Sequence, residues 1–221
     1  MMLYLIPGLG ADGRLFIPLL TCLPATIQPH GLEWLPPAAI DEPLAAYAAR
    51  LAAPVPLDIP CWVAGVSFGG MVALEVGRLR PLVRVIQISS LSDARQLRPA
   101  LRLVRATGLY RLAPPQLLRA VPQIAKWFFG IEDTEVYALL RSFLANMNAD
   151  YTRWATQAVF AWRQQDLGSS ITIHGTHDRV FPLAGRIVDY QVAGGPHFMV
   201  CSHAGEVGAI LTRILTASYA S

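Results

Sequence analysis

The chain has 221 residues, of which 53% are hydrophobic and 15% charged, with a formal net charge of +3. This length suits one α/β domain, and the composition excludes an intrinsically disordered protein. No run of about 18 uncharged apolar residues occurs, so the sequence predicts no membrane span. The first six residues carry no basic leader of a secretory signal, and we expect a cytoplasmic protein.

Short apolar runs alternate with helical patterns along the chain, which is typical of a mostly parallel sheet with crossover helices. The predicted strands are residues 3–6, 27–34, 61–64, 83–88, 171–174 and 187–192. The predicted helices outside the central segment are residues 44–53, 68–79 and 204–216. The fold class is therefore expected to be α/β.

The central segment, residues 91–170, departs from this rhythm because it shows helical periodicity and no clear strand. Leu97, Leu101 and Val104 share one helix face, for example, while arginines occupy the opposite face. We expect residues 1–90 and 171–221 to form one core, with residues 91–170 as a helical lid inserted in the same domain.

The inserted segment is also basic, with no acidic residue between Ala94 and Ile131. Its basic residues are Arg95, Arg98, Arg102, Arg105, Arg111, Arg119 and Lys126. Nucleic-acid binding is not favoured, since the segment is rich in Leu and Pro, poor in Lys and without polar aromatic platforms. A solvated helix face is the favoured interpretation. The alternatives are steering of an anionic substrate and contact with a membrane surface.

The three cysteines, Cys22, Cys61 and Cys201, are far apart and show no metal-ligand spacing. An odd number cannot all pair as disulfides. We expect them to be small buried hydrophobes in a reducing compartment, and we expect no metal site.

A first glycine motif, Gly8-Leu9-Gly10-Ala11-Asp12-Gly13, follows the first predicted strand. It matches the dinucleotide-binding pattern G-x-G-x-x-G, and Glu33 lies 20 residues beyond the motif, where a ribose-binding acid belongs. The pattern is weak by itself in a chain with 17 glycines. It leaves an NAD(P)-dependent oxidoreductase as an alternative.

The second motif, Gly65-Val66-Ser67-Phe68-Gly69, has the form G-x-S-x-G and lies between a predicted strand and a predicted helix. That context is typical of a nucleophile elbow, a sharp turn that exposes a serine Oγ and needs small residues around it. A serine needs a base and an orienting acid to act as a nucleophile. The motif therefore predicts that an acid and a histidine follow.

Both partners occur in the expected order beyond later strands. Asp178 follows the predicted strand 171–174, and His197 follows the predicted strand 187–192. Asp93, after the strand 83–88, is an alternative acid. Three other histidines, His174, His177 and His203, are alternative bases, with His174 expected to pack or bond locally and His203 to cap the last helix.

These motifs resemble those of the α/β-hydrolase superfamily. The resemblance rests on Gly65–Gly70, on residues 174–182 and on Gly195-Pro196-His197-Phe198, and it covers the chain except residues 91–170. It implies a chain that starts at the strand before the oxyanion loop, without the family's first two antiparallel strands. That loop reads Pro7-Gly8-Leu9-Gly10, with Pro7 in place of the usual histidine.

The resemblance implies a serine hydrolase that cleaves a carboxylic ester or thioester of a fairly apolar acid. Ser67 is then the nucleophile, His197 the base and Asp178 the acid, and the backbone N–H groups of Leu9 and Phe68 bind the oxyanion. No cofactor is needed. The expected partner is a small apolar ester or thioester. We expect no binding of nucleic acid, and a homo-oligomer is compatible with the composition.

The predicted substrate pocket includes Trp127, Phe128 and Phe198, and Leu109, Tyr110, Phe129 and Phe143 are further candidates, although packing of the lid on the core explains most of them equally well. A small-ligand-binding protein with little turnover remains an alternative on the same fold. Hydrolysis or lysis of C–C bonds is another.

Overall fold

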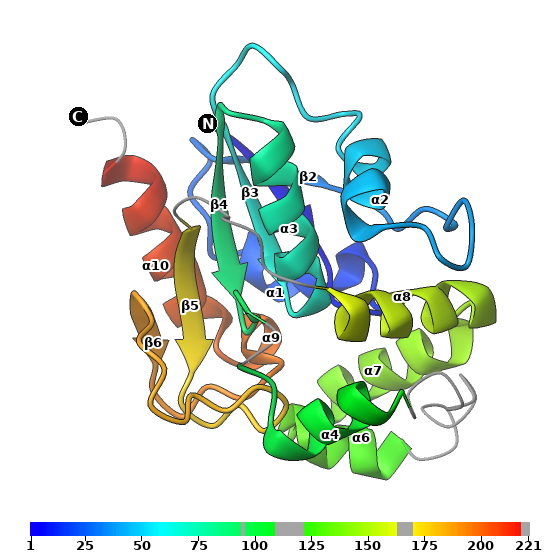
Figure 1. Cartoon of the computed structure of the whole chain (residues 1–221). Helices are drawn as coiled ribbons and strands as arrows, with labels where there is room; N and C mark the ends of the chain where they lie inside the picture. Colours follow the sequence, from blue (N-terminus) through cyan, green and yellow to red (C-terminus); the bar gives the residue numbers. More distant parts are fainter. Residues whose placement is uncertain (94–95, 109–121, 163–169, 218–221) are drawn as a thin grey trace.

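The computed structural model describes residues 1–93, 96–108, 122–162 and 170–217. Six parallel strands form one sheet in the order β2-β1-β3-β4-β5-β6 (Figure 1). The strands are β1 (Met2–Ile6), β2 (Gln28–Gly31), β3 (Cys61–Val66), β4 (Val83–Ile88), β5 (Ser170–Gly175) and β6 (Tyr190–Val192). The predicted α/β class with a mostly parallel sheet is confirmed.

Helices connect the strands and form the segment between β4 and β5. Those of the core are η1 (Gly13–Phe16, a 3-10 helix), α1 (Ile17–Leu20), α2 (Leu44–Leu51), α3 (Phe68–Leu79), α9 (Met199–Ser202) and α10 (Ala204–Ala217). Those between β4 and β5 are α4 (Pro99–Thr107), α6 (Pro122–Phe129), α7 (Thr134–Asn146) and α8 (Ala149–Ala161).

Alternate side chains of the strands point to opposite faces of the sheet and build two separate cores. Leu3 and Leu5 of β1 pack with α1, α9 and α10 on one face. Tyr4 and Ile6 of the same strand pack with α2 and α3 on the other face (Figure 1). With helices on both faces, the inner strands β1 and β3 are apolar on both sides, as a buried parallel sheet requires, whereas the edge strand β2 is exposed.

The helices α4, α6, α7 and α8 lie beyond the carboxyl ends of the strands (Figure 1). Phe143 of α7 belongs to the core of the α10 face, whereas Trp154 of α8 belongs to the core of the α3 face. The helical segment therefore straddles the carboxyl edge of the sheet. Arg95, Arg111, Arg119, Leu109 and Tyr110 lie outside the described residues.

Three expectations differ from the structure. β2 and β6 are shorter than predicted, and both are edge strands that pair with a single neighbour. Ile187, for example, is 99% exposed and follows a tight turn closed by the Arg186 N–H donating to the Leu183 carbonyl (2.7 Å). Cys22 is exposed, whereas Cys61 and Cys201 are buried as expected.

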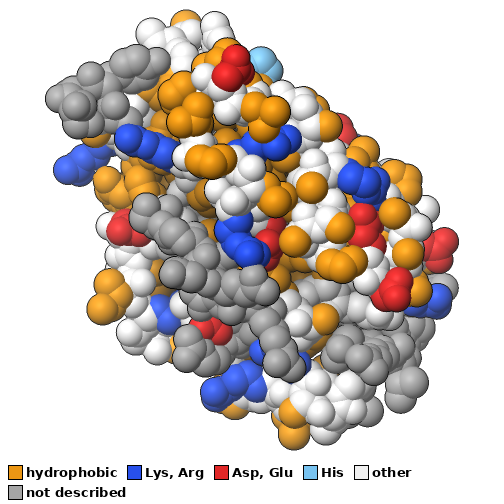
Figure 2. Space-filling view, turned by 45° about the horizontal axis from the view of Figure 1, so that its top comes forward, with side chains coloured by type: hydrophobic (Ala, Val, Ile, Leu, Met, Phe, Trp, Pro, Cys, Tyr) orange, Lys and Arg blue, Asp and Glu red, His pale blue; other side chains and the backbone are white. Residues whose placement is uncertain are grey.

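The described helices include none that is both long and apolar enough to cross a membrane. Figure 2 shows one face of the molecule, where charged side chains of both signs are scattered among hydrophobic ones. The described part of that face therefore presents no patch of a single charge.

Candidate active site

Ser67 occupies the sharp turn between β3 and α3. Its φ of 55° and ψ of −119° place a non-glycine residue in a strained conformation, and its N–H donates to the Ile88 carbonyl at 2.9 Å. A Cβ at Gly65 would collide with the Gly69 carbonyl, and a Cβ at Gly69 would collide with the backbone of Ile6 and Pro7. The glycines of the motif thus allow the turn to form.

His197 lies in the loop after β6 and faces Ser67. Its Nε2 atom is 3.0 Å from the Ser67 Oγ atom, and its Nδ1 atom is 2.8 Å from Asp178 Oδ2. Because an ionised carboxylate only accepts hydrogen bonds, Nδ1 carries the proton and Nε2 is free to accept the Ser67 hydroxyl proton. The imidazole is therefore in the tautomer that a general base needs.

Asp178 follows β5 and is buried. Its Oδ1 atom accepts the backbone N–H groups of Val180 (2.9 Å) and Phe181 (2.8 Å). Burial by itself raises the pKa of Asp178, but His197, the Phe181 N–H and His174 together outweigh it, so that the pKa lies below its ordinary value. The carboxylate stays ionised, and Asp178, not Asp93, is the residue that the structure places against His197.

The remaining predicted bases do not contact Ser67 in the described structure. His174 is buried, and its Nε2 lies 2.6 Å from the Phe181 carbonyl oxygen. His177 is exposed, and His203 bonds to the Ser202 hydroxyl at 2.9 Å.

The two residues predicted to bind the oxyanion, Leu9 and Phe68, both lie next to Ser67 in the structure. Phe68 is the first residue of α3, so its N–H has no acceptor within that helix. Leu9 follows Gly8, whose carbonyl accepts the Ala11 N–H (3.0 Å) and the Trp34 indole N–H (3.1 Å), so the loop is held by its own hydrogen bonds. Leu9, Ser67 and Phe68 all line one cavity.

That cavity has a volume of about 320 Å³ and an almost wholly apolar wall. Apart from Ser67 and His197, the only polar side chain that lines it within the described chain is Thr156. Its apolar walls come from the loop after β1, from the elbow, from the loops after β5 and β6 and from the inserted segment. The members from the inserted segment are Ala125, Phe129, Leu140, Phe143, Leu144, Met147, Val159 and Phe160.

The predicted pocket residues divide into two groups. Phe198 lines the cavity, but Trp127 and Phe128 do not line it and are 57% and 37% exposed. Ala125 and Phe129, four positions apart on α6, form the face that lines it, so the intervening aromatic residues point elsewhere. Of the further candidates, Phe129 and Phe143 line the cavity, whereas the other members from α7 and α8 were not predicted.

The glycine-rich loop does not have the surroundings of a dinucleotide site. Gly13 starts a 3-10 helix, and the α-helix that follows, α1, has four residues and begins four positions later. A Cβ at Gly10 would meet the side chain of Met147 at 2.9 Å. The loop is packed against α7–α8 and near Ser67, which does not favour the oxidoreductase alternative.

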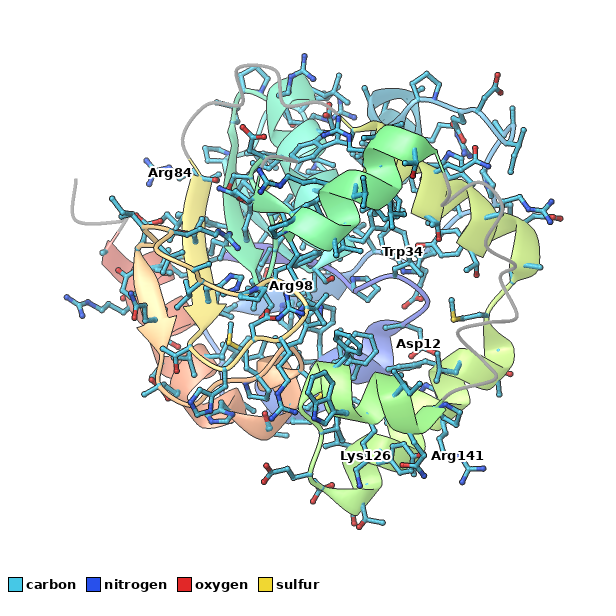
Figure 3. The ribbon with its side chains drawn as sticks, turned by 60° about the horizontal axis from the view of Figure 1, so that its bottom comes forward. Asp12, Trp34, Arg84, Arg98, Lys126 and Arg141 are labelled. Carbon is cyan, nitrogen blue, oxygen red and sulfur yellow. The ribbon has the colours of Figure 1, made fainter. Side chains whose placement is uncertain are left out.

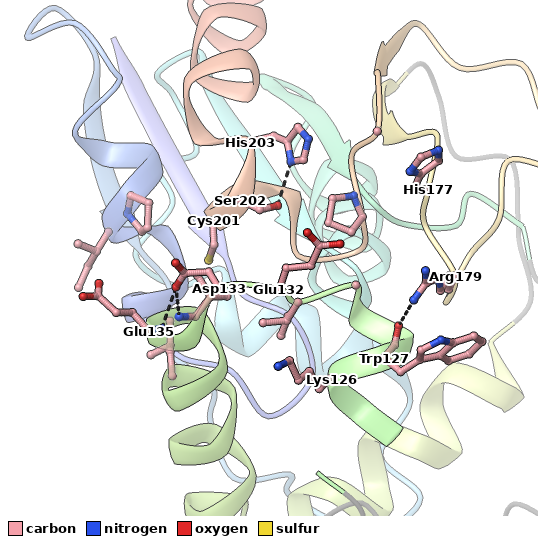
Figure 4. A pocket seen from close by; sticks show the side chains of 18 of the residues that line it. Lys126, Trp127, Glu132, Asp133, Glu135, His177, Arg179, Cys201, Ser202 and His203 are labelled. Atoms are coloured by element: carbon pink, nitrogen blue, oxygen red, sulfur yellow. Dashed lines mark hydrogen bonds between the residues drawn. The ribbon is translucent and has the colours of Figure 1, made fainter. Parts of the chain in front are cut away.

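A larger groove of about 1110 Å³ lies on the other side of α6 (Figure 4). Its labelled charged side chains are of both signs, from Lys126, Glu132, Asp133, Glu135 and Arg179. Neither Ser67 nor His197 lines it.

The described residues contain no cluster of three or more potential metal ligands. Figure 3 shows Arg98 apart from Lys126 and Arg141, so these cations do not form one patch.

No protein-family model matches the chain, and no curated protein matches it. Solved structures do. A hydrolase from Oleispira antarctica has a TM-score of 0.73 at 11% identity, covering 97% of this chain and 90% of its own. A structure from a study of Nitrososphaera gargenis carboxylesterases has a TM-score of 0.74 at 15% identity, covering 98% and 90%. A thermophilic esterase from Thermogutta terrifontis has a TM-score of 0.68 at 14% identity, covering 98% and 90%.

The chain has the α/β-hydrolase fold. In an α/β-hydrolase, the nucleophile turn stands at the carboxyl edge of the sheet, with acid and base in loops beyond later strands. Ser67, Asp178 and His197 occupy those three places. At these identities the likeness establishes the fold alone.

Proposed function

We propose that the protein is a serine hydrolase that cleaves a carboxylic ester or thioester of a fairly apolar acid. The observation that carries the proposal is the continuous chain of contacts from Ser67 Oγ to His197 (3.0 Å) and from His197 to Asp178 (2.8 Å) beside an apolar cavity. The hydrolases and esterases among the similar structures support it.

In the first half-reaction, His197 Nε2 takes the proton of the Ser67 hydroxyl as Oγ attacks the substrate carbonyl carbon. Asp178 holds the resulting imidazolium by its hydrogen bond to Nδ1. The imidazolium then gives its proton to the leaving alcohol or thiol, which departs and leaves the acyl group on Ser67. In the second half-reaction, His197 deprotonates water, the water attacks the acyl carbon, and the free acid leaves.

The negative charge that develops on the carbonyl oxygen is stabilised by the N–H groups of Leu9 and Phe68. Such a donor typically lowers the barrier by about 3 kcal/mol, because it is already oriented before the charge forms. Ser67 also precedes α3, whose N-terminal end carries partial positive charge. The chemistry requires no metal or organic cofactor.

The cavity favours an apolar acyl group over a charged one, since a charge placed there would lose its water without gaining a partner. Helices α6, α7 and α8 supply much of its wall, so the inserted segment roofs the acyl site. The partner is therefore a small apolar ester or thioester.

A chain-length series of p-nitrophenyl esters tests this function, with matched acyl thioesters to separate the two bond types. We expect a burst of p-nitrophenol followed by slower turnover if the acyl-enzyme accumulates, and a preference for medium over acetyl chains. Binding of these compounds without turnover would instead indicate a ligand-binding protein on this fold, and a response to NADH would indicate an oxidoreductase.

A further inference from the structure

His174 is a buried histidine that the proposed reaction does not use directly. It lies on β5 and is 1% exposed. Its Nε2 atom is 2.6 Å from the carbonyl oxygen of Phe181. Because a carbonyl oxygen only accepts hydrogen bonds, Nε2 of His174 carries a proton and donates it there. This bond joins the strand to the loop that carries Asp178, three residues beyond the aspartate.

The same Nε2 atom lies 3.4 Å from Asp178 Oδ2, the oxygen that accepts the hydrogen bond of His197. The other oxygen of that carboxylate accepts the N–H groups of Val180 and Phe181. The carboxylate therefore lies between two imidazoles on one side and the backbone of its own loop on the other. Its orientation depends on the position of Phe181.

Phe181 also contacts the base itself. Its ring meets the His197 ring edge to face, with 5.4 Å between centroids and an angle of 78°. Fixing the Phe181 backbone consequently fixes two neighbours of His197, namely the Asp178 carboxylate and the Phe181 ring. Both contacts restrict the imidazole to the orientation that faces Ser67.

We infer that His174 is a positioning residue, which holds Asp178 and Phe181 so that His197 keeps its catalytic orientation. The inference rests on the proposed function. His174 acts through Asp178 and Phe181 and does not touch the reacting atoms.

The charge state of His174 suits this role. Burial and the cation of Arg186 lower its pKa, while Asp178 and the Phe181 carbonyl oppose that shift and His197 adds to it, so that the net pKa lies below its ordinary value. The ring is neutral at pH 7 and does not form a competing ion pair with Asp178. The negative charge of the carboxylate remains available to the imidazolium of His197.

Two substitutions separate positioning from simple packing. His174→Gln keeps an N–H donor near the Nε2 position, whereas His174→Phe fills the site without a donor. His30→Gln, an exposed position on β2, serves as the control. For His174→Phe we expect kcat on a p-nitrophenyl ester to fall by about tenfold to a hundredfold, as when a partner that orients a site ligand is removed, with KM within about twofold.

His174→Gln should recover much of kcat, and the rate of fluorophosphonate labelling should follow kcat in every variant. Equal kcat in folded His174→Phe and wild type would overturn the inference, as would equal losses in His174→Phe and His174→Gln. Failure of the wild type to react with a fluorophosphonate overturns the proposed function and this inference with it. Labelling of wild type and His174→Phe at the same rate overturns this inference alone.

Discussion

The Nε2 atom of His197 lies 3.0 Å from the Oγ atom of Ser67, although 130 positions separate the two residues in the chain. The parallel sheet makes this contact, because the carboxyl ends of β3 and β6 open onto the same edge. The loop after β5 brings Asp178 to the other side of His197. The fold thus assembles three side chains that are distant in sequence at one edge of one sheet.

The identity of the acid is tested by comparing two aspartates. Asp178→Asn should lower kcat by several orders of magnitude, because an amide can hold the imidazole in the wrong tautomer and cannot balance its charge. Asp93→Asn should change kcat less than about tenfold, since Asp178 is the partner of His197. Steady-state kinetics on a p-nitrophenyl ester measures both. The reverse order of the two effects would assign the acid to the loop after β4.

The apolar cavity is tested by filling it from α6. Ala125 lines the cavity, while its neighbour Ile124 is 53% exposed and does not line it. Ala125→Phe should lower kcat/KM for an octanoyl ester by about tenfold or more relative to an acetyl ester, because only the longer chain needs the filled volume. Ile124→Phe is the matched control and should leave that ratio unchanged. A uniform loss for both esters in Ala125→Phe would show that the acyl chain does not enter this cavity.

The close approach of backbone segments at the elbow is tested at Gly65. Gly65→Ala should destabilise the fold by about 3 kcal/mol or more, because the added Cβ meets the backbone of Gly69 and Gly70 and neither can move freely. Gly205→Ala adds the same methyl group to α10, where nothing lies within 4 Å, and should stabilise by up to about 1 kcal/mol. Urea unfolding monitored by tryptophan fluorescence measures both. Equal stability of the two variants would mean that the turn is looser than described.

Acid should destabilise the protein in two pH ranges. The pKa of His174 lies below its ordinary 6.5, chiefly through burial, so the unfolded chain takes up a proton below pH 6.5 that the folded chain does not. Unfolding therefore becomes easier as pH falls below 6.5, with a slope of up to about 1.4 kcal/mol per pH unit for one proton. Asp178 has a lower pKa in the folded chain than its ordinary pKa of 3.8. The stability that it contributes is therefore fully present above pH 3.8 and is lost as the pH falls through the pKa of the folded chain.

The effect of His174, which acts below pH 6.5, can be isolated with a variant whose side chain at position 174 does not titrate. Urea unfolding of His174→Gln between pH 7.5 and 5.0 should show a flatter dependence on pH than the wild type. Parallel curves for the two proteins would mean that His174 is not held neutral in the folded state.

The main features of the site follow from local sequence rules. A G-x-S-x-G between strand and helix has few conformations to choose from, and Gly65 and Gly69 are where backbone crowding requires them. Asp178 and His197 follow strands of one parallel sheet, so their approach to Ser67 could be expected from the order of the elements. The choice between Asp178 and Asp93 needed the structure, since each lies beyond a strand adjacent to the site.

The substrate pocket could not be predicted in the same way. Helical periodicity shows which residues share a face but not which face packs inward, so Trp127, Phe128 and Phe129 were all candidates and only Phe129 lines the cavity. The contact between Met147 and Gly10 depends on how the α7–α8 turn meets the oxyanion loop, which is a tertiary relationship without a local signal. The bond from His174 to the Phe181 carbonyl likewise depends on the loop closing back on β5.

The most direct measurement of the central claim is covalent labelling of Ser67 by a fluorophosphonate. The strained turn, the Nε2 atom of His197 at 3.0 Å and the adjacent N–H groups make this hydroxyl the expected site of attack. Intact-mass analysis should show one adduct on the wild type, peptide mapping should place it on Ser67, and Ser67→Ala should remain unlabelled and lose ester hydrolysis while keeping its fold. An adduct of equal stoichiometry on Ser67→Ala, or full hydrolysis by that variant, would contradict the account.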